Sequence, residues 1–385
     1  MMDVSFFISR RLHFKGGIAI VSIAVSYLVM IVAVSISSGF RNEIRGGLSA
    51  LSGDVQLTPP NLNVLDQSRP IEKEPSYLPY IYDIDGVASV EPAIYMAGIV
   101  KQDNDIHGVL FKGVHGDNGG ISIPSRLSQL TGLAAGERMT AYFVGEKVKV
   151  RQFEVNSVYD ALVEADDKLV VYADMHDLQR LAGWTEDQVS AMEITLDMSH
   201  KDEESIYEAT QEIGAVVNAY SEESEAPVVA ISSVSRFPQL FDWLNLIDFN
   251  VFFILVLMTV VAGFNMISGL LIMLFENIST IGLLKALGMK DRSIANAFLS
   301  SAAVLVLKGM LWGNGLALAF CLIQSRTHFL KLDPKNYFVP FVPVNIDAGS
   351  VVLADITSFV VIMLLLLIPT LFISKVDPAD TVRMK

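Results

Sequence analysis

The chain has 385 residues, of which 52% are hydrophobic and 18% charged, and its mean hydropathy is +0.45. Ordinary soluble proteins carry roughly 25% charged residues, so this composition argues against a soluble enzyme and also against a disordered chain. The net charge of −14 argues against a nucleic-acid partner, because phosphate binding needs a basic surface. The single cysteine, Cys321, excludes an intramolecular disulfide.

Four apolar runs are long enough to cross a hydrocarbon core of about 30 Å, which takes about 20 helical residues. The runs are Ile18–Ile36, Phe249–Phe275, Ile294–Ile323 and Val351–Ile373. Together with their borders they predict transmembrane helices over residues 18–39, 247–275, 294–323 and 351–373. Four spans place both ends of the chain on the same side of the membrane.

The first run has a second interpretation as a secretory signal peptide, because Arg10, Arg11 and Lys15 precede it and small residues follow it. Its 19 uncharged residues exceed the 7–15 residues usual for the apolar part of such a peptide. A membrane span is therefore the preferred interpretation. Residues 1–17 then form an amphipathic lead-in on the cytoplasmic surface.

Residues 40–246 form a polar insert between the first two spans, with 15 Lys and Arg against 33 Asp and Glu. The insert therefore carries a net charge of −18, as expected for a domain in water. Alternating apolar residues around Phe153 and Val155 predict a strand, whereas the helical spacing of Ile206 and Ile213 predicts an amphipathic helix. We predict an α+β domain, built as one unit or as two subdomains.

Basic residues in short loops indicate which side of a membrane protein faces the cytoplasm. The N-terminal segment, the loop 276–293 and the tail 374–385 share one side and hold three basic residues each. The loop 324–350 on the other side also holds three but is longer. The density of basic residues thus places the ends in the cytoplasm and the acidic domain outside it.

The sequence contains none of the motifs of phosphate-binding loops, HExxH zinc sites or GxSxG nucleophiles. Its six histidines have no spacing typical of metal ligands. We predict no catalytic residue, no metal site and no cofactor in this chain.

Polar residues inside the predicted spans are costly in lipid and are usually paired or functional. Lys308 near the middle of the third span either pairs with Asp355 of the fourth span or extends along its own helix towards the membrane surface. Asn265 and Asn314 can add hydrogen bonds between helices. Small residues beside Lys308 stand at the spacing that lets another helix approach closely, at Gly309 and Gly313.

The loop between the second and third spans, residues 276–293, contains a short segment with helical spacing. One face combines Lys285 with apolar residues, namely Ile278, Ile281, Leu284 and either Leu287 or Ala286. Gly288 follows as a typical helix stop. A compact apolar face in so short a loop needs a surface to cover it, so we predict a helix that docks into a groove of another subunit.

This loop resembles the coupling-helix motif of permeases of the FtsX/MacB/LolC–LolE superfamily, in which the helix docks onto a separate ABC ATPase. The matching residues are Glu276, Ile281, Gly282, Leu283, Lys285, Ala286, Leu287 and Gly288. The predicted topology of one span, a large extracytoplasmic domain and three further spans is also similar to that of the superfamily.

Further segments resemble the lipoprotein-releasing branch of this superfamily, at Ile8–Arg11, Ser38–Ile44, Ser52–Leu57 and Leu332–Val344. The tail Lys375–Arg383 is similar to the tail of the superfamily as a whole. The resemblance therefore extends over the full length of the chain.

The resemblance implies a permease subunit in the inner membrane that extracts lipoproteins from membrane lipid and hands them to a periplasmic carrier. The partners implied are a cytoplasmic ABC ATPase, which binds ATP and magnesium, and a second permease, either a copy of this chain or a paralogue. The first two spans would enclose the lipoprotein cavity, with wall residues Val25, Leu28, Met30, Val32, Phe253, Leu257, Val260 and Phe264.

Two alternatives stay open within the superfamily, a MacB-like efflux permease and an FtsX-like activator of a cell-wall hydrolase. From a different class of protein, a sensor or adhesion module without an ATPase has the same spans and the same acidic domain. The coupling loop distinguishes this last alternative, because only a transporter needs it as a docking site.

Overall fold

A computed structural model describes residues 17–60, 62, 69–102, 105–115, 120–144, 148–161, 169–197 and 202–374. The chain divides into two compact units. The membrane unit comprises Met1–Arg41, Leu244–Lys331 and Phe341–Lys385, and the sheet unit comprises Asn42–Trp243 and Leu332–Pro340. Nearly all of the predicted amphipathic lead-in and of the C-terminal tail lies outside the described residues.

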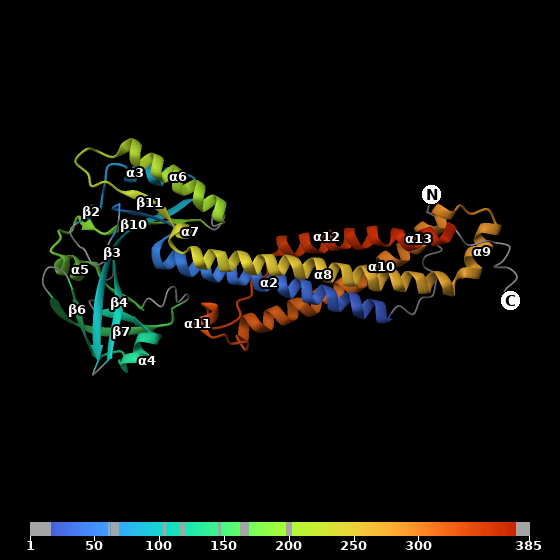
Figure 1. Cartoon of the computed structure of the whole chain (residues 1–385), viewed down its shortest axis with the longest axis horizontal. Helices are drawn as coiled ribbons and strands as arrows, with labels where there is room; N and C mark the ends of the chain where they lie inside the picture. The colour runs from blue at the N-terminus through green and yellow to red at the C-terminus, as the bar shows by residue number, and fades with distance from the viewer. Residues whose placement is uncertain are drawn as a thin grey trace. The chain divides into compact units, whose positions relative to one another are not determined.

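In the described part of the chain, four helices are long and apolar enough to cross a membrane. They are α2 (Gly17–Ser52), α8 (Pro238–Glu276), α10 (Asp291–Thr327) and α12 with its continuation α13 (Ala348–Leu365 and Leu367–Ser374). Within the membrane unit these helices run side by side (Figure 1). The last of them is interrupted at Leu366, because Pro369 lacks the N–H that would bond to the carbonyl of Leu365.

The helices α2 and α8 are 36 and 39 residues long and exceed the apolar runs that predict them. The helix α2 continues through polar residues to Ser52, and α8 already begins at Pro238, a residue suited to the first helical turn. The division between the units falls inside both helices, after Arg41 and before Leu244. Each of the two helices therefore belongs partly to the membrane unit and partly to the sheet unit.

The close approach predicted from the spacing of Gly309 and Gly313 is confirmed, and the neighbouring helix is α2. A Cβ atom on Gly309 would lie 2.6 Å from the Cβ of Ile23. A Cβ atom on Gly313 would lie 2.5 Å from the carbonyl oxygen of Ala24. Only glycine fits at these positions, because the second contact is with backbone that cannot move aside.

We expect Gly313→Leu to destabilise the membrane unit by about 1–3 kcal/mol, the usual cost of overpacking. Thermal unfolding of the purified full chain in detergent measures this change. The matched control is Gly315→Leu, since a Cβ atom at Gly315 meets no atom within 4 Å. Equal melting temperatures for the two variants would contradict the packing of α10 against α2.

Among the described residues, nine strands of the sheet unit form one sheet in the order β11-β1-β10-β3-β4-β8-β5-β7-β6. The strands are β1 (Val55–Thr58), β3 (Val87–Gln102), β4 (Asp105–Val114), β5 (Ile121–Pro124), β6 (Arg138–Phe143), β7 (Lys149–Tyr159), β8 (Leu169–Asp174), β10 (Ala191–Leu196) and β11 (Val229–Ser232). Two short strands, β2 (Ile71–Glu72) and β9 (Gln188–Val189), pair separately.

The sheet closes on itself, because β3 also pairs with β6, at Ile99 with Tyr142 and Val100 with Ala141. The strands from β3 round to β6 therefore form a closed ring, while the earlier part of β3 pairs with β10. The rings of Phe111 and Phe143 pack in its core with centroids 4.9 Å apart. A closed ring leaves no free edge at this end of the sheet.

Helices are interspersed with the strands of this unit, namely α3 (Leu78–Tyr82), α4 (Ser125–Thr131), α5 (Met175–Ala182), α6 (Glu203–Tyr220), α7 (Ser233–Arg236) and α11 (Pro334–Tyr337). The predicted amphipathic helix is α6, which buries Ile206 and Ile213. The predicted strand is β7, which buries Phe153 and Val155. The predicted fold class, four long apolar helices with an α+β domain between the first and the second, is thus confirmed.

Candidate functional site

The loop between α8 and α10 contains a short helix, α9 (Ile278–Ala286). It ends in the manner predicted from Gly288, whose φ of +85° lies in the left-handed region that glycine tolerates. The N–H of Gly288 bonds to the carbonyl of Lys285 at 2.9 Å, and that of Met289 bonds to the carbonyl of Leu284 at 3.0 Å. This pair of bonds is a Schellman motif, which fixes the end of the helix and the direction of the chain beyond it.

The two faces of α9 differ from the sequence-based prediction. Ile281 is only 1% exposed and packs in the core of the membrane unit, and Gly282 is buried beside it. Leu283 and Leu287 are 56% and 76% exposed. Ile281 therefore positions the helix instead of offering a contact, and the apolar surface available to a partner is formed by Leu283 and Leu287.

The other predicted coupling residues surround this surface. Lys285 is held by an ion pair with Asp291 at the start of α10, with 3.1 Å between Nζ and Oδ1. Glu276, Ala286 and Gly288 are exposed, whereas Ile278 and Leu284 are half-buried. The helices α9 and α10 are therefore linked by this salt bridge as well as by the short segment of chain between them.

The predicted wall residues of α8 lie on one exposed stripe, because Phe253, Leu257, Val260 and Phe264 repeat at three- and four-residue spacing. Their exposed fractions range from 40% at Val260 to 65% at Phe264. On α2, Val25 is 56% exposed, and Leu28 and Val32 are half-buried.

Met30 does not belong with these wall residues. It is 1% exposed, and its sulfur atom accepts a hydrogen bond from the Thr259 hydroxyl at 3.5 Å. It fills the space between α2 and α8, so its prediction as a cavity residue is corrected.

The predicted hydrogen bond of Asn314 between helices is confirmed, whereas one of the two arrangements predicted for Lys308 is not formed. Asp355 accepts a hydrogen bond from the side-chain amide of Asn314 at 2.5 Å, so the predicted pairing of Asp355 with Lys308 is wrong. Lys308 lies six residues before Asn314 on α10 and is exposed, as is Asn265 on α8. A separation of six residues turns the two side chains of α10 towards different directions.

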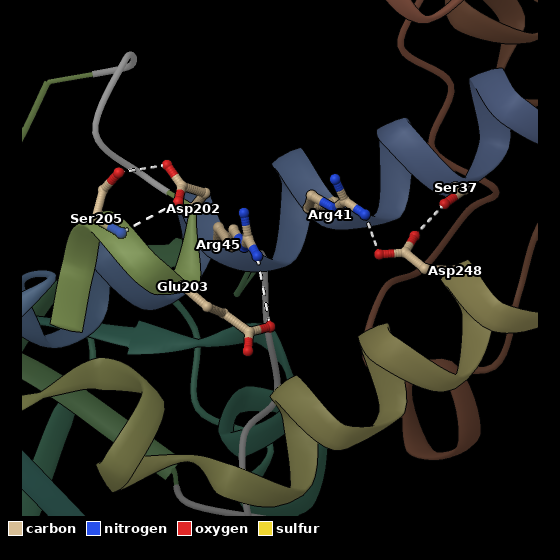
Figure 2. A network of polar contacts seen from close by, with 7 residues as sticks. All are labelled: Ser37, Arg41, Arg45, Asp202, Glu203, Ser205 and Asp248. Carbon is tan, nitrogen blue, oxygen red and sulfur yellow. Dashed lines mark hydrogen bonds and ion pairs between the residues drawn. The ribbon is translucent and has the colours of Figure 1, made fainter. Parts of the chain in front are cut away.

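A polar cluster that the sequence did not reveal joins α2 to α8 inside the membrane unit (Figure 2). Asp248 of α8 accepts hydrogen bonds from Arg41 and from the hydroxyl of Ser37, the latter at 2.5 Å. The Arg41–Asp248 pair is also an ion pair, and the side chains are 42% and 30% exposed. Both oxygens of the Asp248 carboxylate thus have a donor from α2.

The same turn of α2 meets the loop that precedes α12. The N–H of Asn345 bonds to the carbonyl of Ser35 at 3.0 Å, and its side-chain amide bonds to the hydroxyl of Ser38 at 3.0 Å. A Cβ atom on Gly39 would lie 2.3 Å from the carbonyl oxygen of Pro343. The loop is therefore fastened across α2 at this level.

In the sheet unit, Arg45 forms an ion pair with Glu203 of α6, with 3.6 Å between nitrogen and oxygen (Figure 2). Asp202 caps α6 by accepting a hydrogen bond from the N–H of Ser205 at 3.1 Å. This bond and that from the Ser205 hydroxyl hold the pKa of Asp202 below its usual range. The continuation of α2 is thus tied to the first turn of α6.

The last turn of α2 is held by a lysine from the sheet. The ammonium group of Lys112 in β4 donates to the carbonyl of Leu51 at 2.8 Å and to that of Ala50 at 3.3 Å. It also forms an ion pair with Glu193 of β10 at 2.8 Å, and the side chains are only 4% and 9% exposed. The last carbonyls of a helix have no N–H donor within the helix. A buried cation can take the place of these donors and also interacts favourably with the negative end of the helix dipole.

Glu193 is satisfied on its other side by the hydroxyl of Tyr95, which donates to it. Burial raises the pKa of the Glu193 carboxyl above its usual value, although Lys112 acts in the opposite direction. Burial likewise raises the pKa of Tyr95 well above its usual value. The cluster therefore combines charged and neutral hydrogen bonds around the end of one helix.

The chain beyond α2 is fixed to the same sheet. Gly53 turns the chain with a φ of +68°, and the N–H of Asp54 then bonds to the carbonyl of Ile194 at 2.8 Å. The carboxylate of Asp54 accepts from Ser49 at 3.0 Å and from the N–H of Leu196 at 2.8 Å. These bonds attach the end of α2 to β10.

We expect Lys112→Met to lower the free energy of unfolding by about 3–5 kcal/mol, because it leaves Glu193 and two helix carbonyls without their cation. Chemical unfolding of the full chain, followed by tryptophan fluorescence, measures this loss. Lys101→Met on the exposed face of β3 is the matched control. We expect the double change Lys112→Met with Glu193→Met to cost less than Lys112→Met alone, and the opposite order would contradict a buried ion pair.

Comparisons with known proteins find similarity to membrane proteins of transport systems. Residues 252–378 match the family described as FtsX-like permease C-terminal. The "Lipoprotein-releasing system transmembrane protein LolC" of Neisseria meningitidis serogroup B is 22% identical over 412 residues, covering 97% of this chain and 94% of that protein. The protein of the same name from Xylella fastidiosa is 19% identical over 405 residues, with the same coverage.

Among solved structures, the periplasmic region of MacB from Actinobacillus actinomycetemcomitans is 12% identical and has a TM-score of 0.30. This match covers 48% of the present chain and 91% of that chain. The sequence relatives thus align along nearly the whole chain, whereas the structural match is confined to about half of it.

Proposed function

Because this multi-pass membrane protein belongs to the FtsX-like family of ABC transporter permeases, we propose that it extracts lipoproteins from the inner membrane and hands them to a periplasmic carrier. Permeases of this family are not catalytic themselves and work with a partner ATPase. The observation that carries the lipoprotein proposal is the alignment with LolC proteins over 97% of the chain. In this proposal the sheet unit lies in the periplasm, and ATP and magnesium are bound by the ATPase.

Lipoprotein release needs a surface on which acyl chains exchange lipid contacts for protein contacts. Each buried CH₂ group contributes about 0.8 kcal/mol, so removing acyl chains from a membrane is strongly uphill and needs coupling to ATP hydrolysis. The exposed stripe of α8, from Phe253 to Phe264, and Val25 of α2 supply uncharged walls for such a substrate. A second permease, either a copy or a paralogue, would complete the enclosure.

The coupling step is assigned to α9. This helix is continuous in sequence with α8 and is tied to α10 by the Lys285–Asp291 ion pair, so a partner that displaces α9 acts on both helices. The anchored end of α2 would pass a movement of that helix into the sheet unit, because Lys112 and Asp54 attach it to the sheet. Rigid-body displacement of packed elements is a common form of such transmission.

We expect the double variant Leu283→Ala with Leu287→Ala to weaken binding of the ATPase by about 30-fold or more, since two apolar anchors together contribute about 2 kcal/mol or more. Co-purification and titration of the ATPase measure the change. The matched control is Leu311→Ala, because Leu311 is 74% exposed on α10, away from α9. Unchanged binding by the double variant would show that α9 is not the docking site.

The cargo is identified by purifying the tagged chain from its native membrane and analysing the bound proteins and lipids by mass spectrometry. We expect an ABC ATPase together with acylated lipoproteins, and the presence or absence of a second permease defines the dimer. Recovery of the ATPase with a cell-wall hydrolase or an outer-membrane partner would favour the FtsX-like or the MacB-like alternative. Recovery of no ATPase at all would contradict a transporter and favour a sensor or adhesion module.

A further inference from the structure

The contact between Asp355 of α12 and Asn314 of α10 lies inside the membrane unit and has no role in the proposed transport. The amide nitrogen of Asn314 donates to Oδ2 of Asp355 at 2.5 Å. The remaining oxygens of the two side chains, Oδ1 of Asp355 and Oδ1 of Asn314, are both fully buried and both without a hydrogen-bond partner. A single residue pair thus holds two unsatisfied acceptors.

Two orphaned acceptors cannot satisfy each other, because neither carries a hydrogen. A buried acceptor without a donor costs free energy, and more so where lipid excludes water. One proton on Oδ1 of Asp355 removes both defects, since the resulting O–H can donate to Oδ1 of Asn314. The two side chains would then form a reciprocal acid–amide pair with two hydrogen bonds.

Among the residues that the structure describes, the groups that face Asp355 offer no positive charge. From α2, the hydroxyl of Tyr27 is hydrogen-bonded to Ser358, which lies one turn after Asp355 on α12, at 3.0 Å. From α10, the neighbour is the neutral Asn314, and Lys308 is exposed elsewhere on that helix. The apolar run of α8, from Phe249 to Phe275, contains no charged residue. An ionised carboxylate here would place a charge beside a buried oxygen with no counter-ion among the described residues, and such a charge in a membrane span is disfavoured.

We propose that Asp355 binds one proton and is a neutral carboxylic acid in the folded protein, where its pair with Asn314 locks α12 to α10. The proton comes from water and is held between the two side chains. This site is separate from the coupling surface and from the apolar walls. The proposal therefore does not depend on which cargo the protein carries. Deprotonation would leave a charge and two acceptors in the bundle and would loosen these two helices.

Infrared difference spectroscopy of the full chain against the Asp355→Asn variant, with and without ¹³C-labelled aspartate, tests the proton directly. We expect the wild type to show a carboxylic-acid C=O band at neutral pH that shifts with the label and disappears in the variant. If the variant instead loses a carboxylate band, Asp355 is ionised in the wild type and the proposal is overturned.

The pair is tested by melting temperatures in detergent. An asparagine at position 355 can reproduce both hydrogen bonds of the neutral acid, so Asp355→Asn should melt within about 2 °C of the wild type, whereas Asp355→Leu should melt at least about 4 °C lower. Wild-type stability should fall more steeply at alkaline pH than that of Asp355→Asn. Equal losses for the two variants would overturn the acid–amide pair.

Two matched controls distinguish a neutral acid from an ion pair. Asp248→Asn removes a carboxylate that is paired with Arg41, so it should lower the melting temperature even though the change is the same. Lys308→Met should leave the melting temperature and the infrared band of Asp355 unchanged. A band that appears only after Lys308→Met would show that Lys308 is the counter-ion and would overturn the proposal.

Discussion

The ammonium group of Lys112 connects the last turn of α2 to the sheet, through two helix carbonyls on one side and Glu193 on the other. A helix that ends in a protein core must find partners for its last carbonyls, and here Leu51 and Ala50 find them in a strand. The buried charge that this requires is balanced by Glu193 and shared with Tyr95. The result is a helix that begins in the membrane unit and has a fixed end in the sheet unit.

Other polar contacts join helices within the membrane unit. Asp248 gathers Arg41 and Ser37, and Asn314 meets Asp355, so polar side chains of neighbouring helices bind one another. Close packing also holds the helices together, because lipid provides no hydrophobic force between them and their contact depends on complementary shape. Gly309 and Gly313 provide that fit against α2. The bundle is therefore specified by a few polar pairs and by glycines at close contacts, within a largely uniform apolar surface.

The sequence predicted the parts of the fold that depend on local composition and spacing. The four apolar runs predicted four long helices, and Gly288 predicted the end of α9, since such signals lie within a few neighbouring residues. Helix length was not predicted, because α2 continues through polar residues whose partners are distant in sequence. The Lys112–Glu193 pair was missed for the same reason, as 81 residues separate its members. The local signal was a single lysine, Lys112, within the apolar second half of β4.

The exposed face of α9 shows what the spacing of apolar residues can and cannot predict. The helical spacing identified an apolar face but could not decide whether it contacts the chain itself or a partner. The structure buries Ile281, contrary to its expected place on the docking face, and exposes Leu287, as expected. The pairing of Lys308 with Asp355 failed similarly, because topology places helices next to each other without fixing which residues share a level.

The proposal that this chain releases lipoproteins is tested most directly by transfer from proteoliposomes. The chain, its ATPase and any second permease would be reconstituted with a triacylated lipoprotein, and a soluble carrier would be added outside. The account predicts that the lipoprotein moves to the carrier only when ATP is hydrolysed. ATP hydrolysis that proceeds while the lipoprotein stays in the membrane would contradict it.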